Sequence, residues 1–144
     1  MQTATIRWTH GEQFAAITPS SHTLALDSDR ECNKGPGPME LLLVALGSCT
    51  ATDIVLILAK KRQKLESLEV AVSGERADEP PRVWTKLDVV FRVRGKDSEG
   101  GQIDDKAVAD AVRLSDEKYC SVAAMLKKTA HLTMRYEILG LTSS

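Results

Sequence analysis

Residues 38–62 read PMELLLVALGSCTATDIVLILAKKR, and this stretch decides the fold. Pro38 suits the first position of a helix, because the amide hydrogen that proline lacks would have no partner there. Apolar side chains then lie nearly all round the expected helix, and basic residues gather at its end, where they complement the helix dipole. Such a helix needs cover on every side. A second copy of the chain would supply it, so we expect a homodimer; the alternative is a monomer whose two sheets wrap the helix.

The same stretch has to be tested as a membrane span. Asp53 lies well inside the apolar run, with Ser48, Thr50 and Thr52 close by. An aspartate at the centre of a membrane helix disfavours insertion by about 2.5–3.5 kcal/mol. No other segment resembles this one, so the sequence favours a buried helix in a soluble protein and no membrane partner.

The flanking sequence predicts strands and two shorter helices. Alternating apolar residues predict strands at residues 3–8, 13–17, 22–27, 68–76, 83–94 and 131–139. Helical spacing predicts helices at 104–118 and 120–129, and the polar residues 28–37 predict a loop. The fold class is therefore α+β, with antiparallel sheets around one long buried helix. Because no linker or repeat interrupts the chain, we expect a single domain over residues 1–144.

Composition narrows the possible partners. The 144 residues carry 19 Lys and Arg against 20 Asp and Glu, a net charge of −1, so the chain lacks the basic surface that nucleic acid requires. The three cysteines are widely spaced without a CxxC pair, and the three histidines are scattered, so neither a metal site nor a cofactor is predicted. The N-terminus does not read as a secretion signal, and we expect a cytoplasmic protein.

The three cysteines differ in their surroundings. Cys49 lies in the middle of the long helix, about 16 Å from Pro38 and beyond the reach of the helix dipole. A reactive Cys49 would need a nearby cation or hydrogen-bond donors, and an unreactive one would be a small buried apolar residue. Cys120 lies at a helix junction, where free amide groups would favour a thiolate, or it is a core cysteine at a kink. Cys32 lies in the polar loop and is interpreted as a surface thiol.

Two carboxylates share the helix with Cys49. Asp53 follows it by one turn on the same face, so Asp53 either pairs with a cation or serves as a buried structural acceptor. Glu40 precedes Cys49 by nine residues, about 13.5 Å along a straight helix. It could reach a cysteine only across a dimer. The histidines show no spacing that argues for catalysis and are expected to be structural.

Two motifs resemble the OsmC/Ohr family. The run PMELLLVALGSC at residues 38–49 is similar to the family's first-cysteine motif, in which a proline and a carboxylate open a long helix that carries a cysteine. The run EKYCSV at residues 117–122 is similar to the second-cysteine motif. The element order matches over nearly the whole chain, and the first motif looks closest to the YhfA-type branch.

This resemblance implies a fold, an activity and a set of site residues. The fold would be an intertwined homodimer with two sites at the subunit interface. The activity would be reduction of organic hydroperoxides or hydrogen peroxide, with Cys49 as the peroxidatic thiolate and Cys120 as the resolving thiol. An external thiol would be the reductant. In the Ohr pattern a glutamate directly follows the proline; Met39 holds that place here, so the helper role would pass to Glu40.

The family's peroxidases also use an arginine from the N-terminal part of the chain. Arg7 lies in a predicted strand and Arg30 in the loop, and we favour Arg30 because a loop can fold over a site. Two other functions stay open. The protein could be a non-enzymatic dimer that binds an apolar small molecule at the subunit interface, with the cysteines as packing residues. It could also be a redox sensor, which would oxidise without turnover.

Overall fold

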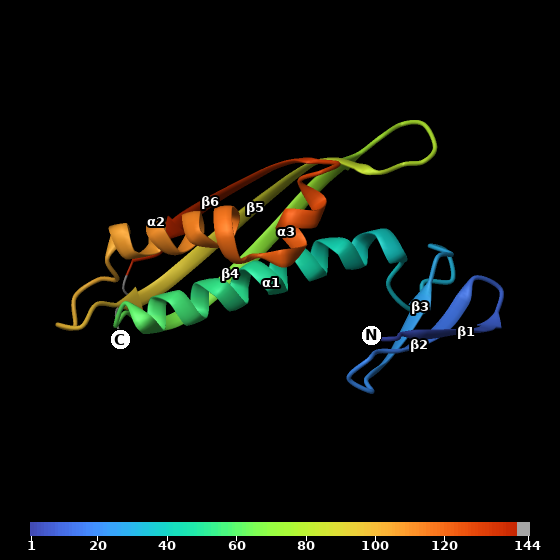
Figure 1. Ribbon diagram of the computed structural model, residues 1–144, viewed down its shortest axis with the longest axis horizontal. Helices are drawn as coiled ribbons and strands as arrows, with labels where there is room; N and C mark the ends of the chain where they lie inside the picture. Colours follow the sequence, from blue (N-terminus) through green and yellow to red (C-terminus); the bar gives the residue numbers. More distant parts are fainter. Residues whose placement is uncertain (141–144) are drawn as a thin grey trace. The chain divides into compact units, whose positions relative to one another are not determined.

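The computed structural model describes residues 1–140, and the chain divides into two compact units, residues 1–42 and the part from Leu43 onward. Each unit contains a three-stranded sheet (Figure 1). The elements in chain order are β1 (Thr5–His10), β2 (Gln13–Ile17), β3 (Thr23–Asp27), α1 (Pro38–Lys60), β4 (Lys64–Arg76), β5 (Trp84–Lys96), α2 (Asp105–Leu114), the π-helical turn η1 (Ser115–Tyr119), α3 (Ser121–Leu126) and β6 (His131–Ile138). The predicted α+β class and element order are confirmed.

The first unit is an antiparallel meander in the order β1-β2-β3. The turn between β1 and β2 contains Gly11 at φ 54°, a left-handed conformation that glycine adopts without a steric cost. Trp8 Nε1 donates a hydrogen bond of 2.9 Å to the Gly11 carbonyl and closes the turn. The loop after β3 then leads into the start of α1, and this loop carries Arg30.

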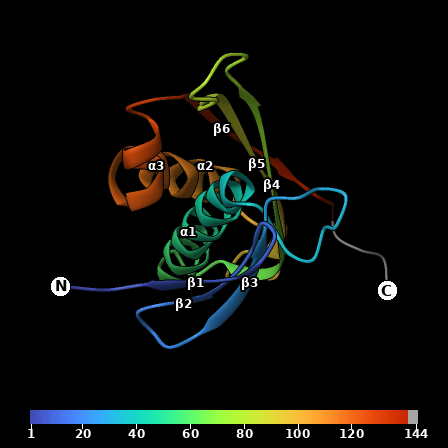
Figure 2. The same cartoon turned by 90° about the vertical axis from the view of Figure 1, so that its right-hand side faces the viewer.

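The second unit is one sheet with its helices on one face. Figures 1 and 2 both show α1, α2 and α3 on the same side of the β4-β5-β6 sheet. Alternate residues of β5 point toward the helices and are fully buried, namely Leu87, Val89, Phe91 and Val93. The residues between them face the other side, where Arg92 pairs with Glu69 at 2.7 Å. This two-sided pattern is the one that the alternation of residues 83–94 predicts.

One feature of this sheet differs from the prediction of purely antiparallel sheets. β4 and β5 are antiparallel, but β5 and β6 run parallel, with Leu87 opposite Leu132 and Val93 opposite Ile138. The physical reason is the connection, because the segment between β5 and β6 contains α2, η1 and α3. A parallel pair requires a crossover of that length, whereas a short turn joins an antiparallel pair.

The long helix is buried along one stripe rather than all round. Within residues 1–140 it is the one helix long and apolar enough to cross a membrane. Its Leu46, Ile54 and Leu58 are fully buried in the core against the sheet. On other faces Val44 is 63% exposed and Leu56 is 56% exposed. A single chain therefore leaves apolar helix surface uncovered, and the homodimer stays a prediction.

Several element boundaries differ from the expected ones. α1 ends at Lys60 rather than near residue 62, because Arg62 adopts a left-handed conformation at φ 59°. β4 begins four residues earlier than expected, at Lys64, since an irregularity between Leu65 and Ser67 disturbs its alternation. α2 ends at Leu114 instead of continuing to residue 118, and η1 follows it.

Candidate functional site

The structure brings Cys49 and Cys120 together. Cys49 lies half-buried on α1, and Cys120 is buried at the start of α3, 71 residues later in the sequence. Both thiols are free, and Cys49 is close enough to Cys120 to affect the ionisation of the Cys120 thiol. Cys49 also packs against the core cluster that contains Cys120. The second unit therefore holds two free thiols close together.

The backbone around Cys120 holds its sulfur in place. Cys120 is the N-cap of α3, and its Sγ accepts a hydrogen bond of 3.3 Å from the Ala123 amide. Burial nevertheless raises the pKa of the Cys120 thiol to about 11, and the neighbouring Cys49 adds to the rise, against the opposing effect of the Ala123 amide. Of the two interpretations of Cys120, the structure therefore favours the core cysteine over the thiolate at a helix start, because desolvation outweighs the amide hydrogen bonds. At neutral pH Cys120 is a thiol.

Asp53 is a structural acceptor, one of the two roles expected for it. Its Oδ2 accepts a hydrogen bond of 2.8 Å from Oγ of Ser115, a fully buried residue of η1. The Ser115 carbonyl in turn accepts a hydrogen bond of 3.0 Å from the Cys120 amide. Sequence reasoning missed Ser115, because its partner lies 62 residues away and a lone serine in a helical pattern gives no signal.

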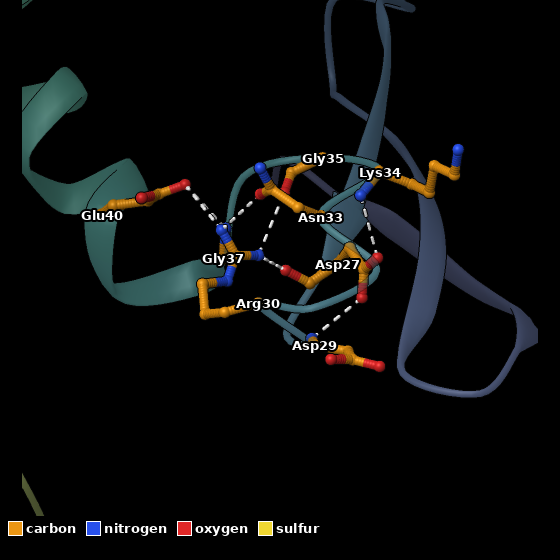
Figure 3. A network of polar contacts seen from close by, with 8 residues as sticks. All are labelled: Asp27, Asp29, Arg30, Asn33, Lys34, Gly35, Gly37 and Glu40. Carbon is orange, nitrogen blue, oxygen red and sulfur yellow. Dashed lines mark hydrogen bonds and ion pairs between the residues drawn. The ribbon is translucent and has the colours of Figure 1, made fainter.

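The other two predicted site residues form a pair in the first unit. Arg30 Nη1 lies 3.6 Å from Glu40 Oε1, in the first turn of α1 (Figure 3). The same Glu40 oxygen accepts a hydrogen bond of 3.0 Å from the Gly37 amide. This bond returns from the third residue of the helix to the residue before Pro38, so it caps the helix as well as orienting the carboxylate.

Backbone carbonyls fix the Arg30 side chain. Its Nη2 donates to the Asp27 carbonyl and, at 3.0 Å, to the Gly35 carbonyl, while Nη1 donates to Asn33 Oδ1 at 3.1 Å (Figure 3). The loop is thus folded around the guanidinium, whose position does not depend on Glu40 alone.

A buried carboxylate, Asp27, organises the Arg30 loop. It accepts amide hydrogen bonds from Lys34 at 3.0 Å and from Asp29 at 2.9 Å. The Lys34 amide is the largest cause that holds the pKa of Asp27 below its usual value; burial opposes it, and the Asp29 amide and the charge of Arg30 add to it. Sequence reasoning missed Asp27 too, although an aspartate at a strand end followed by polar residues is a turn signal.

The predicted residues therefore form two pairs. Cys49 and Cys120 meet in the second unit, and Arg30 and Glu40 meet in the first. Arg7, the other candidate arginine, lies in β1. Cys32 is exposed and accepts a hydrogen bond of 3.3 Å from Gln13 Nε2, as suits a surface thiol. Among residues 1–140, no group of three or more His, Cys, Asp and Glu side chains could hold a metal ion.

An apolar groove lies beside the Cys49 segment of α1. It has a volume of about 440 Å³ and is bounded by one face of α1 and by β4. Its lining is almost entirely apolar and consists of Leu43, Val44, Gly47, Ser48, Ala51, Leu68, Val70 and Val72. Gly47 allows the close approach of the two elements, because a Cβ there would lie 3.1 Å from Val72 Cγ2.

Comparison with known proteins identifies the family. A family model described as OsmC-like protein matches residues 31–135, most of the chain and both cysteine motifs. The chain belongs to the OsmC-like family. It is 42% identical over 137 residues to Protein YhfA of Escherichia coli strain K12, covering 95% of this chain and 98% of that protein. The family and branch inferred from the two motifs are confirmed.

Solved OsmC-like folds superpose over nearly the whole chain. A hypothetical protein from Aquifex aeolicus is 30% identical, with a TM-score of 0.83 and 96% of each chain covered. The organic hydroperoxide resistance protein OhrB of Bacillus subtilis is 14% identical, with a TM-score of 0.62, 95% of this chain covered and 98% of that chain. At that identity OhrB supports the fold alone. The OsmC-like chain therefore shares its architecture with proteins that differ greatly from it in sequence.

Proposed function

We propose that this OsmC-like protein reduces hydroperoxides through its two core thiols. The proximity of Cys49 and Cys120 in the same core carries the proposal, because a peroxidatic thiol and a resolving thiol have to be neighbours. Family membership supports it too, since some solved relatives are named organic hydroperoxide resistance proteins.

The burial of the two cysteines supports the role proposed for each. Cys49 is half-buried, so it is the thiol that a peroxide can approach, whereas Cys120 is buried and protonated. The Cys49 thiolate attacks the terminal oxygen of ROOH and breaks the O–O bond, and the alkoxide takes up a proton and leaves as an alcohol. Cys49 is now a sulfenic acid. Cys120 displaces its hydroxyl, the Cys120 proton leaves in the water that forms, and a disulfide results. Two equivalents of an external thiol restore the reduced pair.

Arg30 and Glu40 are proposed as the groups that prepare Cys49. An arginine near a thiol stabilises its thiolate, and Arg30 is preorganised by carbonyl groups and by Glu40. Because Glu40 precedes Cys49 by nine residues on one helix, we propose that the pair acts on the Cys49 of a second copy. The exposed apolar faces of α1 at Val44 and Leu56 support such a homodimer.

One experiment tests this function directly. Reduced protein is mixed with an organic hydroperoxide and an excess of a dithiol, and peroxide consumption is followed. Cys49→Ser is expected to abolish consumption, while Cys32→Ser, which removes the surface thiol, is the matched control and is expected to leave it unchanged. Full activity in Cys49→Ser would overturn the proposal.

A second function has one observation in its favour. The apolar groove between α1 and β4 has room for a small apolar molecule. In that case the protein would be a binding module in the cytoplasm, and its cysteines would only fill space. A lipid-like molecule that copurifies with the protein, together with thiols that do not react with hydroperoxide, would support this function over the peroxidase.

A further inference from the structure

The segment before Cys120 is held by an unusual contact. The hydroxyls of Ser48, Thr50 and Thr52 on α1 all donate to carbonyls of their own helix, at 2.8–2.9 Å. The buried hydroxyl of Ser115 instead donates to the carboxylate of Asp53, which belongs to an element 62 residues away. A buried hydroxyl needs a partner, but a nearby carbonyl would satisfy it without a carboxylate. The use of Asp53 joins η1 to α1 at this point.

Ser115 connects three parts of the fold. Its amide donates to the Ala111 and Val112 carbonyls at the end of α2. Its side chain binds Asp53 on α1, and its carbonyl accepts the amide of Cys120 at 3.0 Å. That last bond spans five residues and closes the π-helical turn, a geometry that often marks functional sites. The position of Cys120 therefore depends on where Ser115 is held.

The other end of this contact lies on the face of α1 that carries Cys49. Asp53 follows Cys49 by four residues, so the two side chains share one face of the helix. α1 thus presents the peroxidatic thiol and, one turn later, the carboxylate that holds the segment bearing the resolving thiol. The hydrogen bond between Asp53 and Ser115 therefore lies close to the two thiols.

We propose that Asp53 and Ser115 are positioning residues that keep Cys120 in reach of Cys49. The inference rests on the proposed function for its role in turnover. The step it serves is the condensation of the Cys49 sulfenic acid with the Cys120 thiol, which forms the S–S bond and releases water. Hydroperoxide is the oxidant. Without the hydrogen bond between Asp53 and Ser115, η1 and Cys120 move more freely. Disulfide closure therefore slows, while the rate of sulfenic acid formation stays the same.

Quench-flow on Ser115→Ala and Asp53→Asn, each in a Cys32→Ser background, tests the proposal. After one equivalent of hydroperoxide, a sulfenic acid trap and mass spectrometry measure the two steps separately. Ser115→Ala is expected to form the Cys49 sulfenic acid at the parent rate and to close the disulfide about tenfold more slowly, since a hydrogen bond to a carboxylate is lost. Asp53→Asn keeps an acceptor for the Ser115 hydroxyl and is expected to stay near the parent rate. A parent closure rate in Ser115→Ala would overturn the proposal.

A matched control separates positioning from general stability. Lys61, the residue after α1, forms an ion pair with Asp110 of α2, with Nζ 3.3 Å from Oδ2. Asp110→Ala removes this ion pair, which does not involve the cysteine segments, and is expected to leave the rate of disulfide closure unchanged. A closure defect in Asp110→Ala equal to that in Ser115→Ala would overturn a specific positioning role. If Ser115→Ala does not fold, Asp53→Ala removes the same hydrogen bond by a change at the half-buried Asp53 instead of the fully buried Ser115.

A second readout keeps this inference distinct from the peroxidase proposal. In glutathione redox buffers the Cys49–Cys120 disulfide forms without any peroxide, and its equilibrium measures how well the thiols are positioned. Ser115→Ala is expected to lower the effective concentration of the pair about tenfold, and Asp53→Asn to leave it near the parent value. If the parent does not react with hydroperoxide yet shows this difference, the peroxidase fails and the positioning role stands. An equal equilibrium in parent and Ser115→Ala refutes the positioning role.

Discussion

Raising the pH should reveal Cys120 as the slow thiol of this protein. The thiolate is the form that an alkylating reagent attacks. An ordinary thiol with a pKa of 9.0 is about 9% thiolate at pH 8, whereas Cys120, with its pKa raised to about 11, is about 0.1% thiolate. Ionisation alone therefore predicts that Cys120 in the folded protein reacts about 90-fold more slowly than Cys120 in the unfolded chain.

Peptide-resolved alkylation with iodoacetamide measures this ratio. The folded chain and the chain in urea are labelled from pH 7 to 9.5, and Cys120 is quantified by mass spectrometry. Because the folded-state pKa lies above the range, the logarithm of the folded rate should rise by about one per pH unit without levelling off, while the unfolded rate levels above pH 9. Cys49→Ala is expected to speed the labelling of Cys120, since the Cys49 thiol contributes to the raised pKa.

Two results would refute this reasoning. One is a folded-state rate that levels off between pH 8 and 9, which would place the pKa of Cys120 near its ordinary value. The other is a folded rate at pH 8 within about threefold of the unfolded rate, because burial and a raised pKa both require protection. Either result would remove the basis for assigning the resolving role to a protonated Cys120.

Three further predictions concern the loop, the sheet and the exposed face of α1. Arg30→Gln should slow sulfenic acid formation at least tenfold, about what the loss of a thiolate-stabilising cation costs, in stopped-flow mixing, while Arg113→Gln, an exposed arginine of α2, should not. Gly95→Ala should destabilise the protein by more than about 2 kcal/mol in urea unfolding, because the new Cβ would lie 2.4 Å from the Lys64 carbonyl oxygen; an unchanged midpoint would contradict this. Leu56→Lys should shift the sedimentation coefficient from dimer toward monomer, and an unchanged value would argue that α1 is not the dimer surface.

The sequence predicts most of the second unit because its pattern is local. The alternation in residues 83–94 places Leu87 and Phe91 on one face, and the structure buries both. The start of α1 at Pro38 follows in the same way from helix chemistry. Local pattern does not give the direction in which two strands pair, because the same alternation along a strand is compatible with parallel and with antiparallel pairing. β6 became parallel only because two helices and a turn precede it.

The candidate site, too, could be predicted from the sequence only in part. The motifs single out Cys49 and Cys120, but their contact depends on a separation of 71 residues that spacing cannot convert into distance. The rise in the pKa of Cys120 depends on burial, which opposes the amide effect that its place at a helix start predicts. Ser115 and its bond to Asp53 could not be found either, because a hydrogen bond between distant side chains leaves no periodic trace.

The most direct test of the central claim is a titration of the reduced protein with an organic hydroperoxide. Free thiols are counted after each addition, and the product at one equivalent is mapped by mass spectrometry. The account predicts the loss of two thiols per peroxide and a disulfide between Cys49 and Cys120, with Cys32 still reduced. Slow oxidation, or oxidation confined to Cys32, would contradict it and would leave the apolar groove as the functional feature of the fold.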